Sequence, residues 1–528
     1  MDTPHAARLV LAVDHGTSGL KVAVVADDGT VVGFAFEPTP VRFLDDGGAE
    51  QDPEEWWRAL VAAAGRALDG APGARTAVRA VCVSSTFSTT VAVGREGSPV
   101  LPALTWMDSR GAALVRGAVG GVPSLMGYNL RRAARWLRLT GGAPSLSGKD
   151  DCAHALWIRH RRPEAYARTA VFLPSKDWLN LRLTGVCAAS TDSVHLFWAT
   201  DARDPARIAW DGRLCAWLGL DPARLPPLVS PTAVLGPLRA DVAATLGLDP
   251  TVAVVAGSPD HQCALVGSGA VDDFAAHLYV GTSSWIECPL PRRVVDPLHQ
   301  IAAFPTPLPG RFQLIDEQDL AGGALAWFGD DVLFRLVARL GGTSPEGRWA
   351  ALDALAAEAP AGSGGVVFTP WLNGERTPVD DHGLRGGFHG LSTRSRVEHL
   401  VRAVLEGVAL NTRWMLVHVE RLLRRRLDPI RIVGGGARSA LWCRIMADVL
   451  DRTIHRVRDP LAANARGAAF VAAVGLGWRR FDELPGLVPV EAVYEPDPAR
   501  RATYERAWAA FRQVHRGSRR LFREHAGD

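Results

Sequence analysis

Two short segments, one in each half of the chain, share the same design. The apolar run at residues 9–13 continues into Asp14-His15-Gly16-Thr17-Ser18-Gly19-Leu20-Lys21, and the run at residues 277–280 continues into Gly281-Thr282-Ser283-Ser284. A buried strand that ends in a glycine turn presents backbone N–H groups and small hydroxyls at its tip, which suits phosphate oxygens. Because the arrangement occurs twice and far apart, it predicts two related domains that hold one polyphosphate from opposite sides.

Length, charge and cysteine usage narrow the class of protein. A chain of 528 residues is too long for one core and predicts two or three domains. A net charge of +3 argues against a dedicated nucleic-acid binder. The seven cysteines include no CxxC pair, which indicates a reduced protein without a structural zinc site. The chain shows neither a signal pattern nor an apolar run long enough for a bilayer, so we expect a cytoplasmic protein with no membrane partner.

Local patterns predict the elements of both halves. In the first half we expect strands at residues 9–13, 20–26, 31–35 and 78–84, and a helix capped by Asp52 with Pro53 in its first turn. The Pro-rich residues 225–231 are a candidate loop or interdomain connection, and a second α/β set is expected from about residue 252. It should contain strands at residues 276–280, 312–316 and 430–433, and helices at residues 398–423 and 498–523, the last with a solvated, arginine-rich face.

The first Gly-Thr-Ser segment contains the residue types that a phosphate site needs. Gly16 and Gly19 allow close backbone approach, Thr17 and Ser18 can donate to phosphate oxygens, and Asp14 can hold Mg²⁺ directly or through water. The alternative is a tight hairpin with a solvated Lys21. Only three lysines occur in the chain, Lys21, Lys149 and Lys176, and we assign a role to the first alone.

Asp260 follows a predicted strand at residues 252–256 and begins a helix rich in small residues. It is either a helix cap or a general base that accepts the proton of a hydroxyl attacking a phosphoryl group. The positive end of the helix would keep such a base ionised. His261 is expected to serve local packing or hydrogen bonding. Gly434-Gly435-Gly436 would let an adenine ring and ribose lie on the backbone, or is an ordinary glycine-rich turn.

These segments together resemble the FGGY family of carbohydrate kinases over nearly the whole chain. The Gly-Glu-Arg-Thr-Pro string at residues 374–378 and the Gly-Gly-Gly-Ala-Arg-Ser string at residues 434–439 are most similar to xylulokinases. The other matching strings are the D-x-G-T-x-x-x-K of residues 14–21 and residues 50–53 with 56–57, 106–110, 173–179, 183–185, 191–193, 260, 281–283, 370–373 and 406–409.

The resemblance implies an α/β fold in which two ribonuclease-H-like domains of the actin and sugar-kinase superfamily surround a central cleft. It implies an N-terminal sugar-binding domain at residues 1–256, a C-terminal ATP-binding domain at residues 257–480, and a helical segment at residues 481–528 that packs on the domains. The implied partner is a small sugar or polyol, with no nucleic acid, and a homodimer is left open.

The resemblance also implies site residues and cofactors, namely ATP and Mg²⁺. Asp260 would be the catalytic base, and Asp14 would hold the metal. The residues expected to bind nucleotide are Asp14, Gly16, Thr17, Ser18, Lys21, Gly281, Thr282, Ser283, Gly434, Gly435, Gly436 and Ser439. The residues expected to bind substrate are Thr86, Phe87, Ser88, Trp106, Asp108, Asp260 and His261.

The sequence differs from the common xylulokinase pattern at two places where the sugar would be recognised. Their common Gln-Met-His-Gly is Thr86-Phe87-Ser88-Thr89 here, and their Gly-Asp-Asn is Pro259-Asp260-His261. We expect phosphorylation of D-xylulose to D-xylulose 5-phosphate, with ribulokinase, gluconokinase or another polyol kinase as the alternative. Two other classes stay open: an actin- or chaperone-like switch ATPase, and a family member that binds sugar without activity.

Overall fold

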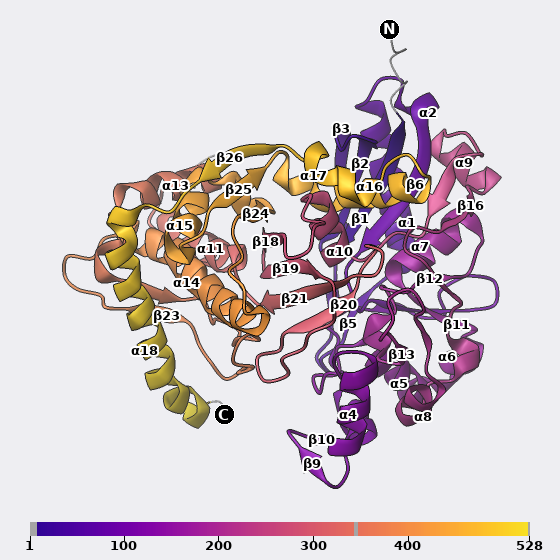
Figure 1. The fold of residues 1–528 in the computed structure, drawn as a ribbon, viewed down its shortest axis with the longest axis horizontal. Coiled ribbons are helices and arrows are strands. Elements are labelled where there is room, and N and C mark those ends of the chain that lie inside the picture. The colour runs from indigo at the N-terminus through magenta and orange to yellow at the C-terminus, as the bar shows by residue number, and fades with distance from the viewer. Residues whose placement is uncertain (1–7, 343–346, 526–528) are drawn as a thin grey trace.

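Two β-sheets organise the computed structural model, which describes residues 8–342 and 347–525 (Figure 1). The first sheet has the spatial order β16 (Val234–Pro237), β17 (Ala253–Val255), β6 (Val78–Ser85), β1 (Leu9–Gly16), β2 (Gly19–Ala26) and β3 (Val31–Pro38). Strands β1, β2 and β3 form an antiparallel meander, while β6 and β17 run parallel to β1.

The second sheet repeats this arrangement. Its order is β20 (Ala302–Pro305), β21 (Phe312–Gln318), β19 (Ser284–Leu290), β18 (Ala276–Val280), β24 (Ile430–Val433), β25 (Ile454–Val457) and β26 (Val490–Tyr494). Here β18, β19 and β21 form the meander, and β24 and β25 run parallel to β18. The shared order of three antiparallel strands followed by two parallel ones confirms the expected α/β fold with two related domains.

Equivalent helices connect equivalent strands. In the first half α1 (Pro53–Asp69) leads from the meander to β6, and in the second half α14 (Val397–Leu423) leads to β24. The predicted cap is confirmed, because the Asp52 side chain accepts from the Glu54 backbone N–H at 3.0 Å. The predicted helix at residues 398–423 corresponds to α14, whose apolar face fills the core of the second half.

Strand β1 is buried on both faces. Leu9, Leu11 and Val13 pack toward α1, and Val10 and Ala12 pack toward α16 (Ala463–Gly475), a helix of the second half. Figure 1 shows α16 lying against the strands of the first sheet. The two halves therefore share a hydrophobic core at this position.

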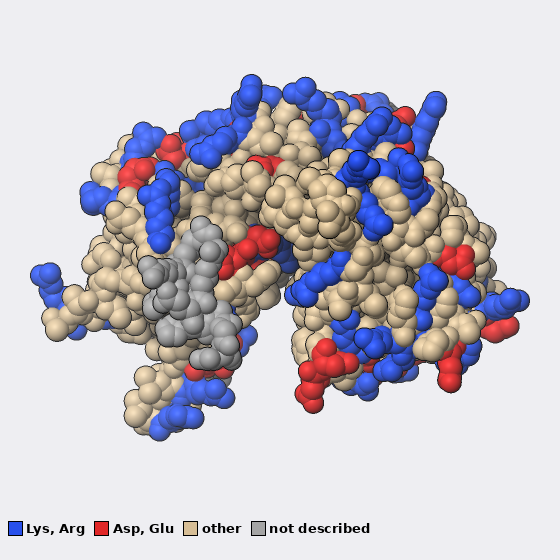
Figure 2. Space-filling view, turned by 90° about the horizontal axis from the view of Figure 1, so that it is seen from below, with Lys and Arg blue, Asp and Glu red and all other residues tan. Residues whose placement is uncertain are grey.

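Helices α10 (Asp260–Gly267) and α16 cross at very close range. A Cβ added to Gly267 would lie 1.8 Å from the Ala463 carbonyl oxygen, and one added to Gly467 would lie 1.8 Å from the Cys263 carbonyl oxygen. Each helix thus needs glycine where the backbone of the other passes. Figure 2 shows the surface of the molecule hollowed between its two halves, on the face seen from below.

A large insertion is made of two segments of the first half, one before α1 and one after β6. Its small sheet has the order β11 (Val171–Pro174), β7 (Thr90–Val93), β8 (Ala103–Leu104), β5 (Ala49–Gln51) and β4 (Arg42–Phe43). Its helices include α3 (Ala112–Val119), α4 (Leu130–Leu139), α5 (Asp151–Arg161), α7 (Ser175–Thr184) and α8 (Gly212–Leu218). Helix α9 (Ala240–Leu246) lies between β16 and β17 and packs in the core of the first sheet. Much of the insertion has a core of its own, built around Trp136, Ile158 and Phe197.

The sequence leaves residues 225–231 open between a loop and an interdomain connection, and the structure decides against the connection. They form a loop interrupted by the short strand β15 (Leu228–Val229), and β16 and β17 follow them and return to the first sheet. For the same reason the expectation that the second α/β set begins near residue 252 is wrong. Residues 435–438 form a single 3-10 turn ahead of α15 (Ala440–Leu450).

The C-terminal helix was anticipated correctly. Helix α18 (Arg501–His525) buries Tyr504, Trp508 and Phe511 in the core of the second half. Within residues 8–342 and 347–525, no helix has the length and apolar character that a membrane span requires.

The helix crossing gives a first prediction. Gly267→Ala should destabilise the protein by about 3 kcal/mol or more, because backbone atoms of α16 occupy the space of the new methyl group. Gly65→Ala is the matched control: Gly65 lies inside α1 with no atom within 4 Å of an added Cβ. That change should stabilise the protein by ~0.5–1 kcal/mol. Thermal unfolding midpoints report both, and a wild-type midpoint for Gly267→Ala would contradict the packing.

Candidate active site

The tip of β1 carries an ion pair. Asp14 lies opposite Lys21 of β2 in the strand register, and Lys21 Nζ is 3.1 Å from Asp14 Oδ2. Asp14 is almost completely buried, and its charge raises the pKa of Lys21 further above the ordinary range. The other carboxylate oxygen lies 3.4 Å from Asn464 Nδ2, at the start of α16. Asn464, which the sequence did not identify, therefore connects the second half to the first Gly-Thr-Ser segment, residues 14–21, which is called the first phosphate loop below.

The turn after β1 is fixed by neighbours from the insertion. Trp106 Nε1 donates to Thr17 Oγ1 at 2.9 Å, and Gln51 Nε2 donates to the Thr17 carbonyl at 3.0 Å. Gly19 has a φ of 155°, and a Cβ there would lie 2.3 Å from the Glu37 carbonyl oxygen. Trp106, expected at the sugar, thus also contacts the predicted phosphate loop.

The second Gly-Thr-Ser loop joins β18 to β19. The Thr282 carbonyl accepts from the backbone N–H groups of Ala321 and Gly323, at 2.8 and 3.0 Å, and the Gly281 carbonyl accepts from Gly322 N–H at 2.8 Å. These bonds pin the loop to the start of α11 (Gly322–Ala326). A pinned loop keeps Ser283 and its neighbours in a fixed position.

The three glycines at 434–436 differ in their surroundings. An added Cβ at Gly434, where φ is 88°, would lie 2.6 Å from the Val280 carbonyl oxygen, so the turn packs against the end of β18. At Gly435 no atom lies within 4 Å of an added Cβ, which leaves backbone open to a flat ligand. The Ser439 hydroxyl accepts from Trp442 N–H at 3.0 Å and caps α15.

Asp260 is the first residue of α10 and faces the same region. Burial raises its pKa to about 7, the nearby charge of Asp14 adds to this, and the charge of His261 opposes it. A carboxyl group with a pKa near neutrality exchanges protons readily at physiological pH. This is the property that a general base at this position needs.

His261 is held by a buried carboxylate. Its Nδ1 donates to Glu287 Oε1 at 2.5 Å, and Glu287 Oε2 lies 3.2 Å from His277 Nδ1. Burial alone would lower the pKa of His261, but the Glu287 charge outweighs it and raises that pKa to about 9. The hydrogen bonding expected of His261 is therefore present, and its Nε2 has no protein partner in the described part of the chain.

Aromatic rings from both halves meet at His261. Its ring centroid lies 4.4 Å from that of Trp285 on β19 and 5.8 Å from that of Phe87 in the first half. Phe87 also contacts Phe304 of β20, with ring centroids 6.0 Å apart. Phe87 thus lies between the halves, where the sequence placed the sugar.

The residues beside Phe87 contact the insertion. Ser88 Oγ donates to the Lys149 carbonyl at 2.7 Å, and the hydroxyls of Thr86 and Thr89 are 3.3 Å apart. The Lys149 side chain is half-buried, and burial together with the charge of Arg376 lowers its pKa. Arg376 belongs to the second half and lies 3.4 Å from Asp319, so Lys149 faces charged groups across the domain boundary.

Asp108 lies behind this region in the wall of the insertion. Its side chain is fully buried, Arg110 contacts both carboxylate oxygens at 2.5 to 3.2 Å, and Asp108 Oδ2 also accepts from Ala49 N–H at 3.1 Å. Arg110 in turn pairs with Glu50 at 2.8 Å. The carboxylate oxygens of Asp108, predicted to bind substrate, are thus occupied by protein hydrogen bonds. The hydroxyl of Ser439, predicted to bind nucleotide, likewise caps α15.

All three lysines of the chain lie in this part of the molecule. Lys21 pairs with Asp14, Lys149 faces the second half, and the fully buried Lys176 donates to the Ala256 carbonyl at 3.2 Å, four residues before Asp260. The sequence alone assigns no role to Lys149 or Lys176. The scarcity of lysine in an arginine-rich chain was the signal that pointed to them.

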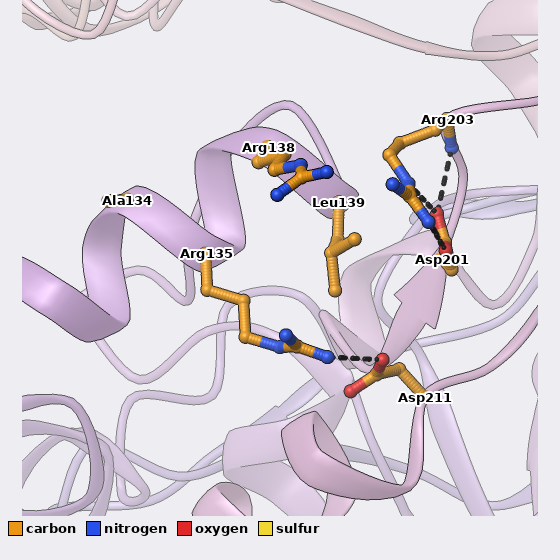
Figure 3. Close-up of a pocket in the computed structure, with 7 residues that line it drawn as sticks. All are labelled: Ala134, Arg135, Arg138, Leu139, Asp201, Arg203 and Asp211. Atoms are coloured by element: carbon orange, nitrogen blue, oxygen red, sulfur yellow. Dashed lines mark hydrogen bonds and ion pairs between the residues drawn. The ribbon is translucent and has the colours of Figure 1, made fainter.

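Two pockets that are open to solvent lie elsewhere. One of about 470 Å³ is lined by the residues in Figure 3: Ala134, Arg135, Arg138, Leu139, Asp201, Arg203 and Asp211. Figure 3 shows Arg135 paired with Asp211, and Arg203 paired with Asp201, which stands two residues before it. The other, of about 790 Å³, lies near Trp57, Arg182 and Asp241. Neither is lined by a predicted site residue.

Comparison with known proteins identifies the group of relatives. Residues 9–120 and 146–267 match the N-terminal domain of the FGGY family of carbohydrate kinases, and residues 277–476 match the C-terminal domain. A xylulose kinase of Escherichia coli K12 is 29% identical over 511 residues, covering 96% of this chain and 98% of the relative. A gluconokinase of Bacillus subtilis 168 is 25% identical over 478 residues, covering 89% of this chain and 88% of the relative. The crystal structure of xylulose kinase from Rhodospirillum rubrum has a TM-score of 0.81 at 27% identity, covering 98% of this chain and all of that one.

The buried pair of His261 and Glu287 gives a second prediction. A histidine whose folded pKa is raised to about 9 stabilises the fold fully below pH 6.5, and this contribution is lost as pH rises through 9. Glu287→Gln should therefore lower the thermal unfolding midpoint most at pH 6.5, and less above pH 9.

The control for this variant is Glu505→Gln, which removes an exposed carboxylate that pairs with Arg413. Arginine does not titrate in this range, so the difference between this variant and the wild type should not change between pH 6.5 and 9. A Glu287→Gln difference that is equally independent of pH would contradict the assignment of charge to His261.

Proposed function

This chain belongs to the FGGY family of carbohydrate kinases, which makes it an ATP-dependent sugar kinase, and from that premise we propose that it phosphorylates a hydroxyl of D-xylulose with Asp260 as the general base. One observation carries the proposal. A half-buried carboxyl with a pKa of about 7 begins α10 and lies close enough to Asp14, at the tip of β1, for that charge to raise its pKa.

Asp260 would accept the proton of the reacting hydroxyl. As the new oxygen–phosphorus bond forms, the bond between the γ-phosphorus and the bridging oxygen of ATP would break and ADP would leave. The O–H bond of the sugar would break as well, and its proton would move to a carboxylate oxygen of Asp260. The N-terminal end of α10 and the positive charge of His261 both favour the ionised form of Asp260. Desolvation favours the neutral form of Asp260, so the opposing effects leave its pKa at about 7.

The phosphate groups would lie between the two Gly-Thr-Ser loops. Lys21 stays charged because Asp14 faces it, and the loop at residues 281–283 is held by bonds to α11. Gly435 offers the open backbone that suits the adenosine end. ATP bound there supplies the phosphoryl group, while these side chains fix its orientation.

Asp14 is also the residue that we propose to hold Mg²⁺. The described residues contain no group of three or more His, Cys, Asp or Glu side chains arranged for a metal. The single carboxylate of Asp14 fits Mg²⁺, which commonly uses one or two carboxylates together with water and substrate phosphates. Bound there, the ion would neutralise phosphate charge.

Water must be kept from the phosphoryl group, since it would compete with the sugar as acceptor. The ring contacts of Phe87 with His261 and Phe304 bring the two halves together beside Asp260. Arg293 of the second half adds a polar bridge, donating to the carbonyls of Arg138, Leu139 and Ala202 in the first. These contacts support a domain closure that shields the reaction.

Gluconate is the second candidate substrate. The gluconokinase relative supports it, and so does the unpartnered Nε2 of His261, because an imidazolium donates well to a carboxylate. D-xylulose comes first because of the xylulose kinase relative, which is more similar to this chain.

The domain division and cellular location are part of the same proposal. The first sheet ends at Val255 in β17, which supports a division after residue 256, and the packing of α18 supports a separate segment from residue 481 onward. All seven cysteines are free thiols, which supports a reducing compartment such as the cytoplasm.

The base assignment gives a third prediction. Asp260→Asn should retain ATP binding and lower kcat by 10³-fold or more, since the amide cannot accept the proton. Coupled ADP release measures turnover, and calorimetry with ATP measures binding. Asp241→Asn is the control, because Asp241 lies in the first turn of α9 and is exposed to solvent. Turnover of Asp260→Asn at the wild-type rate would rule out this base.

The substrate assignment gives a fourth prediction. In an ADP-release assay with Mg·ATP, D-xylulose should stimulate turnover more than D-ribulose, L-ribulose, gluconate or glycerol. Stimulation by gluconate alone would replace the first substrate by the second. A slow ATPase that no sugar accelerates would instead support a switch ATPase.

A further inference from the structure

A buried polar network surrounds the turn that leads to Asp260. The Ala256 carbonyl accepts from Asn180 Nδ2 at 2.8 Å and from Lys176 Nζ at 3.2 Å. Two residues later, Ser258 Oγ donates to Asp192 Oδ2 at 2.6 Å. Asn180 and Lys176 lie on α7, so the insertion holds this turn by side chains from two separate segments.

The backbone of the turn is also tightly placed. Gly257 has a φ of 75°, and an added Cβ would lie 2.1 Å from the Val83 carbonyl oxygen on β6. Ala256 N–H donates to the Ala233 carbonyl and Gly257 N–H to the Pro231 carbonyl, each at 2.9 Å. The residues just before Asp260 therefore have partners on several sides.

The charges of this network are fully removed from solvent. Lys176 and Asp192 have no exposed surface, and Asp177 has 1%. Lys176 Nζ lies 2.6 Å from Asp177 Oδ1, and Asp177 Oδ2 accepts from Ser193 Oγ at 2.6 Å. Asp192 Oδ1 accepts from Ser190 Oγ at 2.5 Å. One ammonium group thus faces two carboxyl groups, and burial raises the pKa of both acids.

Such a cluster is a poor way to gain stability. Desolvation of buried ions offsets most of their attraction, and apolar residues of similar volume often stabilise a fold as well or better. A reacting group, by contrast, gains much from rigid placement, because an error of about 1 Å can cost about 100-fold in rate. The network contacts the turn at Ala256 and Ser258, which together fix the direction in which α10 begins.

We propose that Lys176, Asp192 and Ser258 are positioning residues for the catalytic base. They hold the turn at residues 256–259 so that the carboxylate of Asp260 meets the reacting hydroxyl at the correct distance. This inference rests on the proposed function only for the role of Asp260. It also gives a role to Lys176, to which the sequence alone assigns none.

Ser258→Ala tests the proposal, because it removes the one hydrogen bond between Asp192 and the turn. We expect kcat to fall by 10- to 100-fold while the KM values for sugar and ATP stay within twofold. Ser268→Ala is the matched control: Ser268 is buried, follows α10 at its other end, and its hydroxyl donates to the Leu265 carbonyl at 2.7 Å. It should show a similar loss of thermal stability with wild-type kcat.

A second measurement does not depend on turnover. Hydrogen–deuterium exchange without ligands should be faster at residues 256–263 in Ser258→Ala than in Ser268→Ala. Equal kcat losses in the two variants, or wild-type exchange together with wild-type kcat in Ser258→Ala, would overturn the positioning role. Faster exchange with no sugar-dependent turnover in the wild type would instead reject the proposed function and keep the network as the support of this turn.

Discussion

The close crossing of α10 and α16 is the constraint on which the site depends. Because glycine lets each backbone touch the other, at Gly267 and Gly467, the two helices meet in direct backbone contact, and this contact joins the two halves. The starts of these helices carry Asp260 and Asn464, and Asn464 reaches Asp14 across the junction. Two sheets of equal topology thus bring one acid from a strand tip and one from a helix start into the same electrostatic environment.

Buried charge surrounds the reacting region, and each charge has a defined partner. Lys21 faces Asp14, His261 faces Glu287, and Lys176 faces Asp177. In a medium of low polarity these pairs act over longer distances than they would in water. The pKa of Asp260 near 7 is the sum of such effects, since burial and Asp14 raise it while His261 lowers it. The site is better described by the balance among these groups than by any one of them.

The elements set by local chemistry could be predicted from the sequence, and those set by long-range packing could not. The strands at 9–16 and 276–280 and the cap at Asp52 follow from short patterns. The return of β17 to the first sheet could not be predicted, because a Pro-rich loop has the same sequence pattern within a domain as between two domains. A motif also fixes the type of residue at a position, but it does not fix which neighbours the side chain contacts. Asp108 belongs to a recognised string, yet it binds Arg110 and Ala49, and Asn464 and Lys176 gain their neighbours only through the fold.

The bridge made by Arg293 has a consequence for how this molecule can change over generations. Its guanidinium binds the main-chain carbonyls of residues 138, 139 and 202, and main-chain oxygens persist whatever side chains those positions carry. Mutations at the three positions therefore leave the bridge intact as long as the backbone keeps its course. Side chains around the neighbouring pocket, such as Arg135 and Arg203, can therefore be replaced without removing any acceptor of the bridge between the halves.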